Sequence, residues 1–100
     1  MADFIEKLRN YISNRFNVKA YIEKQGLFTA ITIIGKAGKD LIVCTRKDEK
    51  AYYAKIVHLK NLILWDCIHA IESPQGIFVF APDLNELFRK IVDKLEVFLG

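Results

Sequence analysis

Apolar residues recur at helical spacing near the N-terminus. They lie three or four positions apart between Phe4 and Phe16, and polar side chains occupy most of the other positions. Asp3 comes just before this run, and Glu6 follows it three residues later, which is the pattern of a capping box at a helix start. The pattern therefore predicts an amphipathic helix over residues 3–15.

The same pattern returns near the C-terminus. Asp83 follows a proline and precedes a glutamate by three residues, and a broad apolar stripe then extends from Leu84 to Leu99. We predict a second amphipathic helix over residues 83–99. Its stripe is wider than one face of a small sheet needs. We therefore expect a second copy of the chain to cover part of it, so that the protein forms a homo-oligomer, most simply a homodimer.

Between these helices the apolar pattern becomes that of β-strands. Residues 18–23 alternate between apolar and polar side chains, whereas residues 27–34 and 41–45 are apolar on both faces, as expected for central strands. Glycine-containing and charged segments separate them, and a further strand is predicted over residues 52–57.

The segment between residues 58 and 72 is ambiguous, because its apolar residues fit a helix face as well as a strand. Its β-branched and aromatic content favours a strand over residues 62–72, with a helix as the alternative. Residues 73–76 have the composition of a type I turn, which predicts a hairpin into a last strand at 77–80.

These elements together predict an α+β fold. We expect a mostly antiparallel sheet of five to six strands with an N-terminal and a C-terminal amphipathic helix packed on it, in a single domain over residues 1–100. The chain has 100 residues, of which 52% are hydrophobic, and this composition excludes a disordered protein.

The polar start of the chain bears on its location. Asp3 and Glu6 precede any apolar run, unlike in a signal peptide, and no segment approaches the ~18 apolar residues of a membrane span. We therefore expect a cytoplasmic protein with no membrane partner.

Cys44 and Cys67 are the only cysteines, and their spacing matches no redox or zinc motif. In a cytoplasmic protein we expect both thiols to be buried and reduced, with a disulfide as the rarer alternative. Together with His58 and His69 they lack the paired spacing of a structural zinc site. No metal ion and no cofactor are therefore predicted.

Two basic loops are the strongest functional lead in a chain whose net charge is only +3. If they contact phosphate groups, the binding residues are Lys36, Lys39, Arg46, Lys47 and Lys50. Consecutive strands would place the two loops at opposite ends of strand 41–45. Solvated turns that discourage edge-to-edge aggregation are the alternative interpretation.

The order of helix, strands, Asp40 and then Tyr53-Ala54-Lys55 resembles the core of the PD-(D/E)xK nucleases, which include archaeal Holliday-junction resolvases. In that family an aspartate and a following acid-x-lysine motif hold a metal ion and position water. The resemblance extends over residues 3–80 and implies these roles for Asp40 and Lys55. Because Tyr53 replaces the second acid, a Mg²⁺ site would lack an anchoring charge, and the resemblance implies a degenerate nuclease.

We expect a small non-enzymatic interaction or assembly module that self-associates. The serines and cysteines lack the context of a catalytic nucleophile, so no catalytic residue and no small-molecule substrate are predicted. A nucleic-acid-binding protein that uses its basic loops is one alternative, and the degenerate nuclease is the other. Exposed aromatic residues would suit stacking on bases or on a partner, and the candidates are Tyr21, Tyr52, Tyr53 and Trp65.

Overall fold

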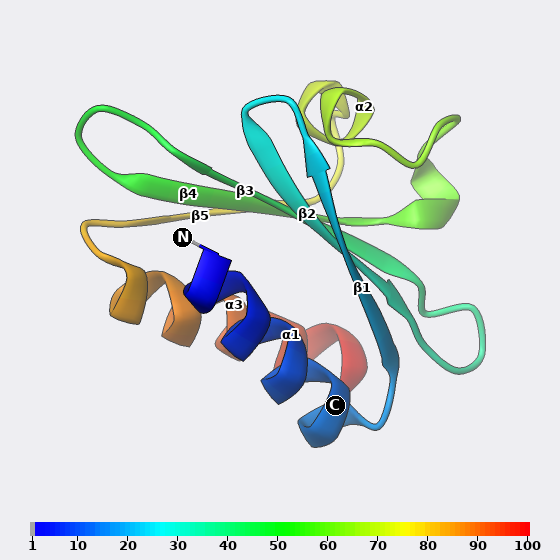
Figure 1. Ribbon diagram of the computed structural model, residues 1–100. Helices are drawn as coiled ribbons and strands as arrows, with labels where there is room; N and C mark the ends of the chain where they lie inside the picture. The colour runs from blue at the N-terminus through cyan, green and yellow to red at the C-terminus, as the bar shows by residue number, and fades with distance from the viewer. Residues whose placement is uncertain (1) are drawn as a thin grey trace.

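A computed structural model describes residues 2–100 as an α+β fold (Figure 1). In chain order the elements are α1 (Ala2–Phe16), β1 (Lys19–Gln25), β2 (Phe28–Ile34), β3 (Leu41–Lys47), β4 (Tyr52–His58), the 3₁₀ turn η1 (Leu59–Asn61), α2 (Cys67–Glu72), β5 (Ile77–Ala81) and α3 (Leu84–Leu99). The strands form one five-stranded sheet in the order β1-β2-β3-β4-β5, and each pairs antiparallel with the next. The predicted fold class is therefore confirmed.

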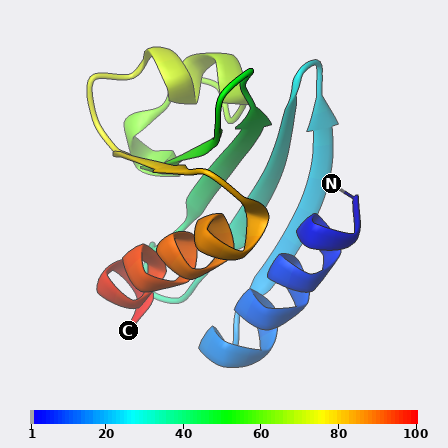
Figure 2. The same cartoon turned by 90° about the vertical axis from the view of Figure 1, so that its left-hand side faces the viewer.

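The helices cover the two faces of the sheet unequally. α1 and α3 lie side by side on one face, which we call the two-helix face (Figure 2). On the opposite face, which we call the α2 face, η1 and α2 cover one part and leave the end near the β3–β4 hairpin without a helix (Figure 1). The sheet thus has one fully layered face and one partly layered face.

The main core lies between the sheet and the two terminal helices. Its fully buried members include Leu8, Ile12, Ile31, Ile33, Leu41, Val43, Ile56, Leu87, Ile91 and Leu95. The two helices run in the same direction, since Phe4 packs edge-to-face against Phe88 near their starts and Arg15 pairs with Glu96 near their ends. Tyr11, further along α1, also packs edge-to-face against Phe88. Burial of these side chains supplies most of the favourable free energy of folding.

The α3 stripe is covered within the single chain. Leu87, Ile91 and Leu95 are buried, and the stripe residues Phe88 and Val92 pack against the same core. The width of the stripe, from which the sequence predicted a homodimer, is therefore accounted for by the sheet and α1. Self-association stays a prediction, but it needs a different surface.

Capping explains where the terminal helices begin. The Asp83 carboxylate accepts a hydrogen bond from the Glu86 N–H at 2.8 Å, which confirms the predicted N-cap of α3. α1 begins at Ala2, so Asp3 lies in its first turn and not at a cap position. Within residues 2–100, no helix has both the length and the apolar character needed to cross a bilayer.

The strand predicted for residues 62–72 is wrong. Residues 67–72 form α2, whose N-cap Asp66 accepts a hydrogen bond from the His69 N–H at 2.8 Å. Cys67 and Ala70, one helical turn apart, are both fully buried against the sheet. Because both side chains are small, this short helix can lie close to the sheet, and the weaker helical periodicity was the correct one.

Gly76 closes the connection from α2 to β5 in a conformation that other residues rarely adopt. Its φ is +103°, and a Cβ atom there would lie 2.7 Å from the Ile56 carbonyl oxygen and 2.7 Å from Val57 Cγ2. Gly38 also has a positive φ, of +73°, but nothing lies within 4 Å of its Cβ position. A comparison of the two glycines therefore distinguishes the effect of a left-handed backbone conformation alone from that of the same conformation with a steric clash at Cβ.

We predict that Gly76→Ala lowers the free energy of unfolding by about 3 kcal/mol, because it adds a steric clash to the left-handed strain. Gly38→Ala, which carries only the strain, should cost about 1 kcal/mol. Urea unfolding of both variants measures the difference. If both variants lose the same free energy of unfolding, an added Cβ at residue 76 does not clash with β4.

Candidate functional site

The five predicted phosphate-binding residues do not form one patch. Lys36 and Lys39 lie in the loop between β2 and β3, and Lys50 lies in the hairpin between β3 and β4, so the two groups sit at opposite ends of β3. Arg46 and Lys47 are neighbours at the hairpin end of β3. Consecutive residues of a strand point to opposite faces, so their side chains leave β3 on different sides.

Aromatic rings lie beside each of these two cations. The Arg46 guanidinium lies 5.5 Å from the centre of the Phe28 ring, and the Lys47 ammonium lies 5.6 Å from the centre of the Tyr52 ring. Such cation–π contacts hold the two charges over the sheet. Arg46 and Lys47 both line a groove of about 780 Å³ near the starts of α1 and α3, together with Lys24 and the exposed Leu27.

The pair implied by the nuclease resemblance is not brought together. Lys55 of β4 lies opposite Cys44 of β3, and Cys44 is four residues further along the chain than Asp40. At the rise of a β-strand this separation is about 13 Å. The Asp40 carboxylate accepts a hydrogen bond from the Gly35 N–H at 3.0 Å and thereby fixes the β2–β3 loop.

Lys55 is instead buried against α2, where it has a structural role. It is 2% exposed, and its ammonium donates hydrogen bonds to the carbonyl oxygens of Ile71 at 3.3 Å and Ser73 at 2.5 Å. These carbonyl groups belong to the C-terminal end of α2, which has unpaired acceptors. Burial lowers the pKa of Lys55 below its ordinary value. Lys55 therefore caps α2 and attaches it to β4.

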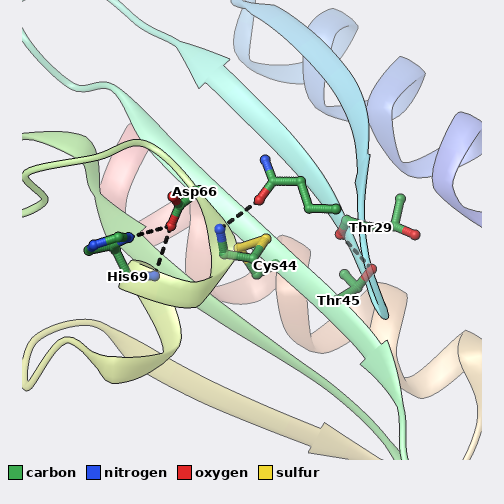
Figure 3. The surroundings of a disulfide bond; sticks show 7 residues. Thr29, Cys44, Thr45, Asp66 and His69 are labelled. Atoms are coloured by element: carbon green, nitrogen blue, oxygen red, sulfur yellow. Dashed lines mark hydrogen bonds and ion pairs between the residues drawn. A yellow bond between two sulfur atoms is a disulfide. The ribbon is translucent and has the colours of Figure 1, made fainter.

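The expectation of reduced cysteines is wrong, whereas that of buried cysteines is confirmed. Cys44 and Cys67 form a disulfide with a Cα–Cα distance of 5.6 Å, and neither residue is exposed (Figure 3). Next to it, the Gln25 side-chain oxygen accepts a hydrogen bond from the Cys67 N–H at 2.7 Å. The disulfide joins the start of α2 to the centre of β3.

His69 and His58 have separate environments. The His69 ring lies 2.7 Å from an Asp66 oxygen (Figure 3), and hydrogen bonds from the His69 backbone and then from its ring lower the pKa of Asp66. His58 lies at the end of β4, where its ring packs edge-to-face on Phe98 at 5.0 Å. Within residues 2–100, no three His, Cys, Asp or Glu side chains are grouped so that they could share a metal ion.

Apolar side chains, most of them exposed, gather on two surfaces that sequence reasoning did not assemble. The first, which we call the 63–68 ridge, consists of Ile63, Leu64, Trp65 and Ile68. The second, which we call the aromatic cluster, lies on the uncovered part of the α2 face and consists of Phe28, Tyr53, Phe78 and Phe80. Of the aromatic candidates from the sequence, Trp65 falls in the ridge and Tyr53 in the cluster.

Comparison with protein-family models, curated proteins and solved structures found no match. The two apolar surfaces, the grooves beside them and the cations around them are therefore the features from which a function is inferred.

We predict that the disulfide stabilises the fold by about 3 kcal/mol, the entropy of closing a loop of 23 residues in the unfolded chain. The double variant Cys44→Ala/Cys67→Ala should lose this amount in urea unfolding. A reducing agent should destabilise the wild type by a similar amount and leave the double variant unchanged. Two free thiols in the native, unreduced protein would contradict the assignment.

We predict that His58 makes the protein less stable in mild acid. Burial, and secondarily the charge of Lys60, lower the pKa of His58 below its ordinary value of 6.5, and its buried Nδ1 has no hydrogen-bond partner within residues 2–100. The unfolded chain therefore binds more protons than the folded one between the lowered pKa and about 6.5, so stability falls as the pH drops through that window.

The variant His58→Phe tests this effect because it keeps an aromatic ring on Phe98 without a titrating group. Urea unfolding between about pH 5 and pH 7.5 should show a shallower loss of stability in the variant than in the wild type. Identical pH profiles would rule out His58 as the cause.

Proposed function

We propose that this protein is a small non-enzymatic interaction module that self-associates through the 63–68 ridge. The observation that supports the proposal is the exposure of its four large apolar side chains within six consecutive residues. The exposed fractions are 94% for Ile63, 54% for Leu64, 55% for Trp65 and 65% for Ile68. A contiguous apolar surface of this kind on a small domain is typical of an interaction site.

The ridge is held in place before any partner arrives. Its C-terminal end enters α2, which the disulfide from Cys67 to Cys44 and the hydrogen bond from the Cys67 N–H to Gln25 fix to the sheet. A preorganised apolar segment loses little conformational entropy on binding, so more of the free energy of burying its side chains remains as affinity. This favours an interface over a merely disordered loop.

The ridge lies beside a groove, and this arrangement favours a second copy as the partner. A hollow of about 430 Å³ is lined by Trp65 and Ile68 on one side and by the turn of the β1–β2 hairpin, with Gln25 and Gly26, on the other. In a two-fold pairing the same patch meets itself, so a ridge next to a groove is self-complementary. Each copy would place its ridge in the groove of the other.

We predict a dimer in solution with a mass near twice the chain mass of 11.5 kDa. The variant Ile63→Glu/Ile68→Glu should raise the dimer dissociation constant at least ~10-fold, about 1.4 kcal/mol, because a charge would be buried in the interface. Sedimentation equilibrium over a range of protein concentrations measures both values.

The control is Val97→Glu, which places one such charge at a residue that is 79% exposed on α3, away from the ridge. It should leave the dissociation constant unchanged. A wild-type mass near 11.5 kDa at every concentration would refute self-association. An equal effect of Val97→Glu would instead move the interface to the two-helix face.

A further inference from the structure

The aromatic cluster is one cross-strand row with one addition. The strand registers place Arg46 opposite Tyr53 and Tyr53 opposite Phe80, and Phe28 lies at the matching end of β2. Phe78 lies two residues before Phe80 on β5 and therefore points to the same face. Three strands of the sheet, β2, β4 and β5, thus carry aromatic rings at one end of the α2 face, with Arg46 of β3 between them.

The two rings on β5 are exposed, and their planes are nearly parallel. Phe80 is 57% exposed and Phe78 is 43% exposed. Their ring centres lie 5.9 Å apart with planes inclined by only 17°, and the Tyr53 ring lies 5.8 Å from Phe80 at 30°. An aromatic residue serving only as core filling would be buried, whereas these rings form a surface on which flat groups can stack.

A groove lies next to the rings, at the edge of the sheet. It has a volume of about 410 Å³, and Phe78 and Phe80 of β5 line one side of it. The other side belongs to α3 and contributes Arg89, Lys90 and Lys94, with Asp93 as the single acid.

The charges of this groove are only partly neutralised. Arg89 pairs with Glu86 at 2.7 Å and with Asp93 at 3.4 Å. Lys90 donates to the Phe80 carbonyl oxygen at 2.6 Å, an uncharged partner, and Lys94 is in no ion pair with residues 2–100. Two lysines without an ion-pair partner among residues 2–100 therefore lie along a groove that borders the aromatic rings, and together with Glu86, Arg89 and Asp93 they give this region a net charge of +1.

We propose that this surface binds single-stranded nucleic acid, with bases stacked on Phe78, Phe80 and Tyr53 and the phosphate backbone along α3 in the groove. Aromatic rings next to a positively charged groove are the combination that holds an unpaired strand without regard to its sequence. Arg46 adds a guanidinium plane, held over Phe28, that can stack on a further base.

The geometry favours a single strand over a duplex. Stacking on Phe80 requires the free face of a base, and a duplex hides its base faces between neighbouring pairs. An acidic peptide would use the cations of α3 but would leave the aromatic rings without a matching partner. Of the five predicted phosphate-binding residues the site uses only Arg46, and that for stacking, since Lys36, Lys39, Lys47 and Lys50 do not line the groove.

Fluorescence anisotropy with labelled 15-mers of oligo(dT) and oligo(U), at two salt concentrations, tests the proposal in the full chain. We expect binding that weakens as salt rises, because counterions are released from the strand. A 15-base-pair duplex should bind more weakly than either single strand. A difference between oligo(dT) and oligo(U) would assign the site to DNA or to RNA.

Two variants separate stacking from charge. Phe80→Ala should raise Kd for the single strands about 10-fold, within the range of one lost base–aromatic stack, whereas Phe80→Tyr keeps a ring and should bind like the wild type. Lys94→Gln should reduce the slope of log Kd against log salt by about 0.7. Its control is Lys60→Gln, an exposed lysine of η1 that lies outside the groove and should leave the slope unchanged.

Three results would overturn the proposal. They are no binding of either strand at low salt, equal or tighter binding of the duplex, and an unchanged Kd in Phe80→Ala. The variant Ile63→Glu/Ile68→Glu should still bind the strands, so loss of self-association and loss of nucleic-acid binding are distinguished in the same set of proteins.

Discussion

The fold depends on one constraint: its central strands are apolar on both faces, so the sheet has to be covered twice. In β3 every residue from Leu41 to Thr45 is buried, and alternate side chains point to opposite faces. The chain devotes two helices of 15 and 16 residues to one face but only a six-residue α-helix and a three-residue 3₁₀ turn to the other. The complete core, the tethered short helix and the exposed aromatic rings all follow from this imbalance.

The short helix is an element that could not persist alone. Six residues form fewer than two helical turns, and the cost of starting a helix is not recovered over that length. The protein attaches both of its ends to the sheet, with the disulfide to Cys44 at the start and the Lys55 ammonium at the end. The ridge before α2 and the aromatic cluster beyond it are consequently two fixed surfaces on either side of a fixed helix.

The sequence predicted most of the fold because the helical and alternating periodicities of the outer elements were long and unmixed. It failed at residues 62–72, where Cys67 and Ala70 carry the helical signal only through their small size and burial, which depend on the sheet below them. The disulfide was missed for the same reason: Cys44 and Cys67 become neighbours only after α2 is placed over β3.

The candidate sites were harder to predict because they depend on strand register. Arg46 and Lys47 are adjacent in sequence and were grouped together, yet they stack on rings at different positions. Phe78 and Phe80 resembled ordinary members of an alternating strand, and only the pairing of β4 with β5 brings Tyr53 beside them. The one available signal was their alternation with the buried Val79 and Ala81, which implies that the other face of β5 is open.

The strictly sequential order of the strands has a consequence for how the chain folds. Strands β1 to β4 pair as consecutive hairpins, so this part of the sheet can form without closing a long loop, a topology associated with rapid folding. Only β5 is added across a longer connection, residues 59–76, which contains η1 and α2. The contact between α1 and α3 is different, since Arg15 and Glu96 are 81 residues apart. During synthesis, the contacts of Phe4 and Tyr11 with Phe88 can form only after the whole sheet and the start of α3 have been made. The helix α1 therefore precedes the sheet in synthesis but completes its packing after it.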